Sequence, residues 1–261
     1  MTSKIPKLKA SPIANMDLAY WNRISENYQS EVLSVFDNDI NGLVEEKIAE
    51  AGIAYPNGNA ADIGCGVGRF LPLLADMFAS IHACDLSSVG IRKAKRRASK
   101  CDNIRFHEVD LSTESLPFPP VDFVLCVNVL IMPALAQRRR AWESVLDQVS
   151  EGGTILLVAP SAESIQMEYL QSVESELGHG SDCQSAIRNS VSEKASTRDL
   201  RLGVHQLDGV RTKHYLIEEL LQLLCSRRFE IREARKLRYP PQGPGLPECW
   251  DWLIVAQRQS Q

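Results

Sequence analysis

Hydrophobic and polar positions follow two different patterns along the chain. From about Asp17 to Glu50, apolar residues recur at mixed helical spacing, which predicts a helical region that ends at Pro56-Asn57-Gly58-Asn59. From residue 60 onward, short apolar runs alternate with amphipathic stretches. The strands predicted there are 60–63, 80–84, 104–109, 123–127 and 154–158, and the helices between them are 69–78, 88–100 and 141–149. Such alternation predicts a parallel sheet with helices on both faces.

The stretch 161–213 breaks this rhythm, because it is polar, weakly periodic and without a strong strand pattern. We interpret it as a helical or loop insertion after the fifth strand, where substrate contacts are often found. A helix at 215–225, a strand at 229–234, a loop rich in proline and glycine at 239–247 and a strand at 250–257 complete the chain. Four parts are therefore expected: a tail and helical lid (1–54), an α/β core (55–160), the insertion (161–213) and the rest of the core sheet (214–261).

Composition narrows the function classes. The 261 residues carry a net charge of −4, which argues against a general attraction to nucleic acid. Seven cysteines without a C-x-x-C pair and five dispersed histidines predict reduced thiols and no metal site. No apolar run reaches about 18 residues and no signal peptide is visible, so we expect a cytoplasmic protein without a membrane span.

The stretch Asp62-Ile63-Gly64-Cys65-Gly66-Val67-Gly68 carries the most information about function. Glycines at a strand-to-helix turn allow a ligand to approach the backbone closely, because no Cβ stands in the way. A dinucleotide-binding loop requires G-x-G-x-x-G, but here the third glycine is Gly68 and the required position is Arg69. The acidic Asp62 before the glycines suits a ligand end that is cationic and lacks phosphate.

Two further aspartates follow the next predicted strands. Asp85 ends the second strand, at the distance where a carboxylate can accept both hydroxyls of a ribose. Asp110 ends the third strand, where a carboxylate can accept from an exocyclic amine such as that of adenine. Either aspartate alone is better explained as a strand-end cap or turn former. Since the carboxyl ends of parallel strands share one edge, the three features are expected to converge on one crevice.

With these residues, the chain resembles the class I S-adenosylmethionine-dependent methyltransferases. Asp62–Gly68 resembles their first motif, 121–130 their fourth-strand motif, and Gly152-Gly153-Thr154-Ile155-Leu156 the turn into the fifth strand. The resemblance implies an α/β fold with a Rossmann-like, mostly parallel sheet of seven strands, the last of them antiparallel. It also implies S-adenosylmethionine as the methyl donor, S-adenosylhomocysteine as the product and a small-molecule acceptor, with no metal.

The resemblance also assigns cofactor contacts by position. The glycine loop would lie along the methionine part of the cofactor. Asp85 would hold the ribose and Leu86 would pack on the adenine, whose rim Asp110 and Leu111 would contact. Asn128 and Val129 would face the sulfonium and the acceptor. The N-terminal aromatics would form a lid, or else pack this segment on the sheet. The residues so implied are Tyr20, Trp21, Tyr28, Asp62, Gly64, Cys65, Gly66, Gly68, Asp85, Leu86, Asp110, Leu111, Asn128 and Val129.

The reaction itself places few demands on side chains, since methyl transfer is a direct displacement that depends on alignment. A hydroxyl or thiol acceptor usually needs a general base. His214 with Tyr215 is the candidate pair for that role, with packing at a helix start as the alternative. Acceptors based on nitrogen, oxygen, sulfur or carbon are all compatible with these motifs. The N-P-P-Y type of motif is absent, because Asn128 is followed by Val129-Leu130-Ile131, which argues against methylation of exocyclic base amines.

Other functions stay open at this point. A protein or RNA methyltransferase would use basic surfaces such as the run Arg92–Lys100, although charge runs on helices are usually solvated faces. A module that keeps the fold but only binds a partner is the second alternative. A nicotinamide oxidoreductase is disfavoured by the position of Gly68.

Overall fold

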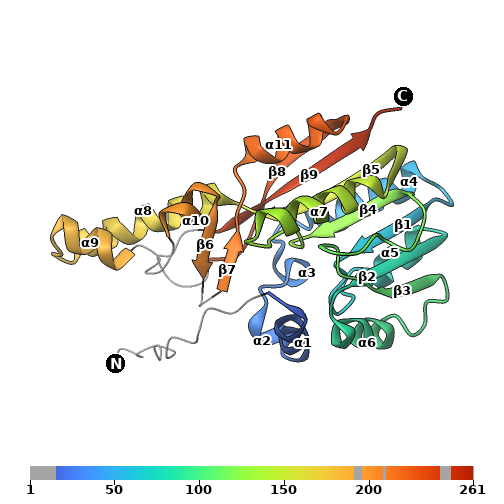
Figure 1. Cartoon of the computed structure of the whole chain (residues 1–261), viewed down its shortest axis with the longest axis horizontal. Helices are drawn as coiled ribbons and strands as arrows, with labels where there is room; N and C mark the ends of the chain where they lie inside the picture. Colours follow the sequence, from blue (N-terminus) through green and yellow to red (C-terminus); the bar gives the residue numbers. More distant parts are fainter. Residues whose placement is uncertain (1–15, 191–195, 208–209, 242–247, 261) are drawn as a thin grey trace.

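The computed structural model describes residues 16–190, 196–207, 210–241 and 248–260, and a seven-stranded sheet lies at its centre (Figure 1). The strand order is β3-β2-β1-β4-β5-β9-β8. β9 is antiparallel to both of its neighbours, whereas the strands from β3 to β5 are mutually parallel. The predicted mostly parallel sheet with an antiparallel last strand is therefore confirmed. Its strands are β1 (Asn59–Ile63), β2 (Ser80–Asp85), β3 (Ile104–Glu108), β4 (Val121–Val127), β5 (Val149–Pro160), β8 (Phe229–Arg238) and β9 (Trp250–Arg258).

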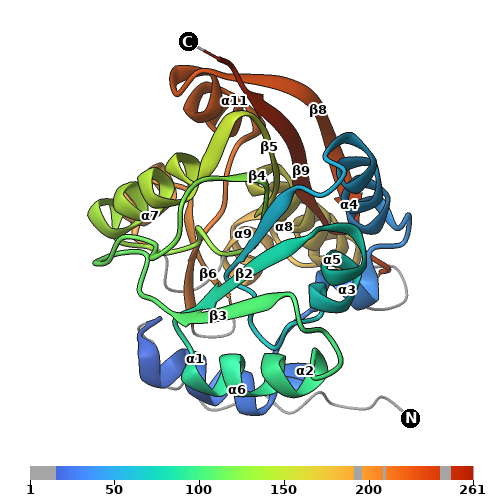
Figure 2. The same ribbon diagram turned by 90° about the vertical axis from the view of Figure 1, so that its right-hand side faces the viewer.

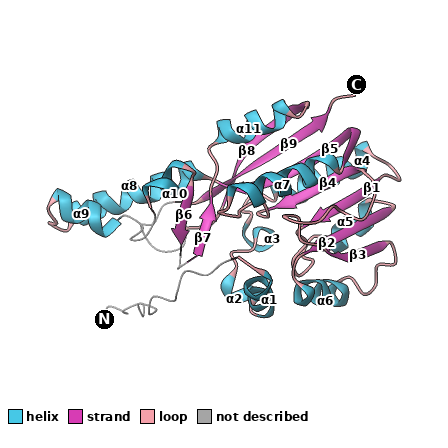
Figure 3. Cartoon of the chain, viewed as in Figure 1, coloured by secondary structure: helices cyan, strands magenta, loops and turns pink. Residues whose placement is uncertain are grey.

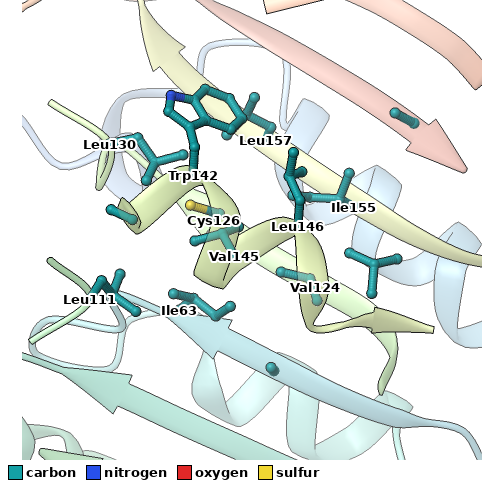
Figure 4. Packing of buried hydrophobic residues seen from close by; sticks show 14 of the residues in the cluster. Ile63, Leu111, Val124, Cys126, Leu130, Trp142, Val145, Leu146, Ile155 and Leu157 are labelled. Carbon is teal, nitrogen blue, oxygen red and sulfur yellow. The ribbon is translucent and has the colours of Figure 1, made fainter. Parts of the chain in front are cut away.

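Helices cover both faces of the sheet (Figure 2). One face packs against α7 (Leu135–Asp147) and α11 (Ile217–Ser226), and the other against α4 (Leu43–Ala54), α5 (Leu71–Met77) and α6 (Ser88–Arg97). The central strands are apolar on both sides: in β4, Val124 and Cys126 face the α7 side and Leu125 faces the other. In Figure 4, Trp142 and Val145 of α7 lie over these strands. Because both faces of β4 are covered by helices, its residues are almost all apolar, as predicted from the sequence.

The N-terminal region is helical but consists of short pieces before α4, namely α1 (Leu18–Glu26), α2 (Tyr28–Glu31) and α3 (Val35–Asn38). The break before α4 has a local cause. Gly42 adopts a left-handed φ of 62°, and the Asp39 carboxylate accepts the backbone N–H of Val44 at 2.9 Å. α1 packs along α6, with Lys93 Nζ donating to the Ser25 and Glu26 carbonyls.

The stretch between β5 and α11 holds the helices α8 (Ala162–Gly178), α9 (Cys183–Ser190) and α10 (Thr197–Arg201), and then a hairpin of β6 (Val204–Leu207) and β7 (Val210–Lys213). Figure 3 shows α8 and α9 extending away from the sheet. The β6–β7 hairpin lies between these helices and the carboxyl edge of the sheet. The sequence did not predict this hairpin, because its four-residue strands are polar and lack clear alternation. The backbone N–H of Lys213 donates to the Ile131 carbonyl at 2.9 Å, which fixes the hairpin beside the end of β4. Residues 242–247 of the predicted loop at 239–247 lie outside the described residues.

Candidate functional site

The glycine loop after β1 owes its shape to contacts that only glycine allows. A Cβ on Gly64 would lie 2.2 Å from Val129 Cγ2, so the loop sits directly against the end of β4. At Gly66 the nearest atom to such a Cβ is Tyr28 Cε2, at 3.7 Å, so the Tyr28 ring at the start of α2 lies in van der Waals range of this part of the backbone. All three glycines have left-handed φ values, 76° at Gly64, 53° at Gly66 and 75° at Gly68. The loop is therefore packed tightly against Val129 at Gly64 and faces the Tyr28 ring, with room for a Cβ, at Gly66.

Asp85 joins this loop to the end of β2. Its Oδ2 accepts the backbone N–H of Gly66 at 2.8 Å, and its Oδ1 accepts that of Ser87 at 2.7 Å. A carboxylate oxygen has two lone pairs, so each oxygen keeps capacity for a ligand hydroxyl. From the sequence we expected Asp85 and the glycine loop to face the same crevice. In the structure the two are joined by a direct hydrogen bond.

Two acidic side chains, Asp62 and Asp85, adjoin the glycine loop. Asp62 is 4% exposed, and its burial, with a smaller contribution from the charge of Asp85, raises its pKa to about 8. Burial also raises the pKa of Asp85, while the Ser87 and Gly66 N–H groups lower it. The Cys65 thiol between them is buried, and its pKa is raised well above the ordinary value, so it stays protonated. Two carboxyl groups that resist ionisation together favour a cationic ligand beside them.

Asp110 and Leu111 lie at the end of β3. Asp110 Oδ1 accepts from both the backbone N–H of Ser112, at 2.8 Å, and its hydroxyl, at 2.7 Å. Leu111 is buried in the core on the α7 side, and Leu86 is half-buried after β2. The carboxylate of Asp110 thus forms its own turn and keeps Oδ2 for another donor.

Asn128 and Val129 follow β4 and meet the loop. Asn128 has a left-handed φ of 53°, which is uncommon outside glycine. Its Nδ2 donates to Asp251 Oδ2 at 2.7 Å, and its Oδ1 is buried without a hydrogen-bond partner. Sequence reasoning missed Asp251, which the reversed direction of β9 brings to this edge. It also did not connect Asp251 with its second donor, Tyr239, the first residue of the predicted loop at 239–247.

The N-terminal aromatics occupy two places. Tyr28 faces Gly66, and burial raises the pKa of its hydroxyl. Tyr20 and Trp21 pack edge to face on α1, with ring centroids 5.1 Å apart. Sequence reasoning also missed Asn22, whose Oδ1 accepts the Ser87 hydroxyl at 2.8 Å and so connects α1 to the loop that carries Asp85.

His214 and Tyr215 are built into the core. The Tyr215 hydroxyl donates to the Leu130 carbonyl and accepts from Trp142 Nε1 at 3.1 Å. His214 is 5% exposed, its Nδ1 lies 3.1 Å from the Thr212 carbonyl oxygen, and burial lowers its pKa to about 3. A buried hydroxyl with two partners and a histidine of such low pKa are poor proton acceptors.

Within the described ranges, no three histidine, cysteine, aspartate or glutamate side chains gather where they could hold a metal ion. Nor does any described helix have the length and apolar character needed to cross a membrane.

Comparison with known proteins identifies the domain. Residues 60–153 match the methyltransferase domain family, and this range contains the glycine loop, Asp85, Asp110 and Asn128. No curated protein sequence matches the chain.

Solved structures match over nearly the whole chain at low identity. The N-methyltransferase NodS from Bradyrhizobium japonicum WM9, in complex with S-adenosylhomocysteine, has a TM-score of 0.60 and 14% identity, covering 92% of this chain and 99% of that one. Magnesium protoporphyrin IX methyltransferase from Synechocystis PCC 6803, with bound S-adenosylmethionine, has a TM-score of 0.57 and 15% identity, with 93% and 95% covered. At such identities the similarity shows a shared fold.

Proposed function

Because the chain carries a class I S-adenosylmethionine-dependent methyltransferase domain, we propose that it transfers a methyl group from S-adenosylmethionine to a small-molecule acceptor and releases S-adenosylhomocysteine. The observation that supports this methyl donor is the arrangement at the carboxyl edge, where the glycine loop, the buried Asp62 and the hydrogen-bonded Asp85 adjoin.

The residues of this edge fit the cofactor. The carboxyl groups of Asp62 and Asp85 favour a cation, as the methionine end requires. Asp85 keeps lone pairs for the ribose hydroxyls, and Asp110 Oδ2 is available for the adenine amine. Tyr28 would cover the methionine part, because its ring already faces Gly66.

S-adenosylmethionine supplies an activated methyl group on a sulfonium. The chain's own task is to align the acceptor with that methyl and to exclude water. The contact between Val129 and Gly64 fixes the end of β4 against the glycine loop, which supports a position for Asn128 beside the proposed acceptor.

Two observations support a small acceptor. The insertion is anchored over the same edge, since the Lys213 N–H donates to the Ile131 carbonyl and the Tyr215 N–H to the Pro160 carbonyl at 2.8 Å. Part of the positive charge of the basic helix α6, which an RNA or protein substrate would use, is engaged in contacts within the protein. Lys93 binds α1 carbonyls and Arg97 donates to the Val67 carbonyl at 3.0 Å.

Thermal and denaturant unfolding with S-adenosylhomocysteine test the donor assignment. A ligand at about 100 times its dissociation constant stabilises the native state by about 2.7 kcal/mol. The matched control is adenosine diphosphate, which shares the nucleoside but has phosphates. If neither S-adenosylmethionine nor S-adenosylhomocysteine stabilises the protein, the assignment is wrong. Incubation with a metabolite library, scored by release of S-adenosylhomocysteine, then tests the small-molecule acceptor.

A further inference from the structure

Three side chains from separate strands meet at the carboxyl edge of the sheet. Asp251 Oδ2 accepts from Asn128 Nδ2 at 2.7 Å and from the Tyr239 hydroxyl at 2.5 Å. Asn128 follows β4, Tyr239 follows β8 and Asp251 lies near the start of β9. Because β9 runs antiparallel to β5, Asp251 pairs with Pro160, at the end of β5. We call Asn128, Tyr239 and Asp251 the edge cluster.

The edge cluster adjoins the glycine loop. Val129, the residue after Asn128, is so close to Gly64 that a Cβ there would lie within 2.2 Å of Val129 Cγ2. The cluster and the loop are thus the two sides of one junction between β4 and β1, which pair in parallel up to Cys126 and Ile63. A group held by the cluster would be next to a methyl donor held by the loop.

The hydrogen bonds of the cluster leave one acceptor atom unmatched. Donation from Nδ2 to Asp251 fixes the Asn128 amide, and its Oδ1 is buried without a partner. A buried acceptor without a donor is costly and usually has a functional or solvent explanation. The left-handed φ of 53° at Asn128 is a second cost at the same residue, of a kind that concentrates at ligand sites. An N–H or O–H group of a ligand would satisfy Oδ1.

The charge of the edge cluster indicates whether the ligand group is an N–H or an O–H. Asp251 is 9% exposed, and none of the ion pairs found among the described residues includes it. Its burial raises its pKa, whereas the hydrogen bonds from Tyr239 and Asn128 lower it. A buried carboxylate without a cation favours a ligand that carries or develops positive charge.

We propose that the edge cluster recognises the methyl acceptor and that this acceptor is a primary or secondary amine; this rests on the proposed methyltransferase function. Asn128 Oδ1 accepts an N–H of the neutral amine, and Asp251 and Tyr239 position the Asn128 amide. The nitrogen lone pair forms the N–C bond while the C–S bond breaks and its electron pair stays on sulfur. Positive charge thereby moves onto nitrogen, toward Asp251, and one N–H proton then passes to water.

A hydroxyl acceptor fits this site less well. It would need a base to remove its proton, but Asp251 Oδ2 already accepts two hydrogen bonds from the protein, which leaves little capacity on that oxygen for a ligand proton. His214, the other titratable group considered near this edge, has a pKa of about 3.

The test compares amines with isosteric alcohols, for example benzylamine with benzyl alcohol and piperidine with cyclohexanol. Binding to the S-adenosylhomocysteine complex is followed by calorimetry, and methylation with labelled S-adenosylmethionine. We expect amines to bind and react at least tenfold better than their alcohol partners. Asp251→Asn should raise the KM for the amine about tenfold or more, yet change the Kd for S-adenosylhomocysteine less than twofold. Tyr239→Phe should raise the KM by a smaller factor, and Asp147→Asn, in an exposed ion pair with Arg227, should change neither.

Preference for alcohols, failure of every amine to bind the S-adenosylhomocysteine complex, or an unchanged KM in both Asp251→Asn and Tyr239→Phe would overturn the proposal. Failure of the wild-type protein to bind S-adenosylhomocysteine would be a different result, because it overturns the methyltransferase function itself. Should Asp251→Asn not fold, Tyr239→Phe decides.

Discussion

The carboxylate of Asp85 accepts the backbone N–H of Gly66 at 2.8 Å, so the residue at the end of β2 holds the loop that follows β1. One side chain thereby shapes the loop and keeps lone pairs for a ligand. If Asp85 also binds the ribose, as proposed, its replacement should affect both the structure of the loop and the affinity for the cofactor.

Asp85→Ala should lower both stability and cofactor affinity. Loss of the bonds to Gly66 and Ser87 leaves two N–H groups without their partner and should cost about 1–3 kcal/mol of unfolding free energy. Affinity for S-adenosylhomocysteine should fall at least tenfold, since a ribose contact is lost as well. Denaturant unfolding and calorimetry measure the two effects. Unchanged affinity would show that Asp85 only shapes the loop.

Gly64→Ala should be far more damaging than Gly152→Ala. Both glycines have left-handed φ values, 76° and 75°, but a Cβ at Gly64 would clash with Val129, whereas nothing lies within 4 Å at Gly152. Gly152→Ala should cost about 1–2 kcal/mol from backbone strain alone, and Gly64→Ala about 1–3 kcal/mol more from overpacking. Chemical denaturation of both variants measures the difference. Adding Val129→Ala to Gly64→Ala should restore part of the loss, and equal costs at the two glycines would contradict the packing argument.

Stability without ligand should depend on pH through Asp62. Its pKa is about 8 in the folded protein and near 3.8 in the unfolded chain, so between these values the folded state keeps a proton that the unfolded state has released. The free energy of unfolding should therefore fall as pH rises from about 4 to 8, by at most about 1.4 kcal/mol per pH unit. Asp62→Asn should flatten this dependence in denaturant titrations between pH 5 and 8. An identical slope in both proteins would assign the pH dependence to other groups.

Tyr215→Phe should reduce stability and leave turnover unchanged. The Leu130 carbonyl and Trp142 Nε1 both lose their partner, which should cost about 1–3 kcal/mol. A catalytic base would instead lower kcat by roughly 10²–10⁴-fold. Measuring kcat per folded molecule, at a temperature where the variant is native, separates the two roles.

The sequence predicted the parts of the site that lie within single strand-and-loop units. Asp62, the glycines and Asp85 were found because each directly ends a strand or opens a turn, and parallel strands bring their ends to one edge. Boundaries were less accurate: β5 begins at Val149, five residues before the predicted start, and the helical stretch before residue 54 is divided at Gly42.

The edge cluster could not be predicted in the same way. Asn128 and Asp251 are 123 residues apart, and their contact depends on β9 lying between β5 and β8. For His214 and Tyr215 the sequence showed residue types suited to proton transfer. It could not show that their polar atoms already have hydrogen-bond partners within the protein.

The reversed direction of β9 has a consequence for how the protein matures. The glycine loop and Asp85 come together as soon as β1 and β2 pair, whereas Asp251 reaches Asn128 only when β9 has entered between β5 and β8. Closing a loop of this length costs more conformational entropy than pairing β1 with β2, so the edge cluster is the more costly of the two arrangements to form. Assembly in order of that cost would make insertion of β9 the step that completes the enzyme.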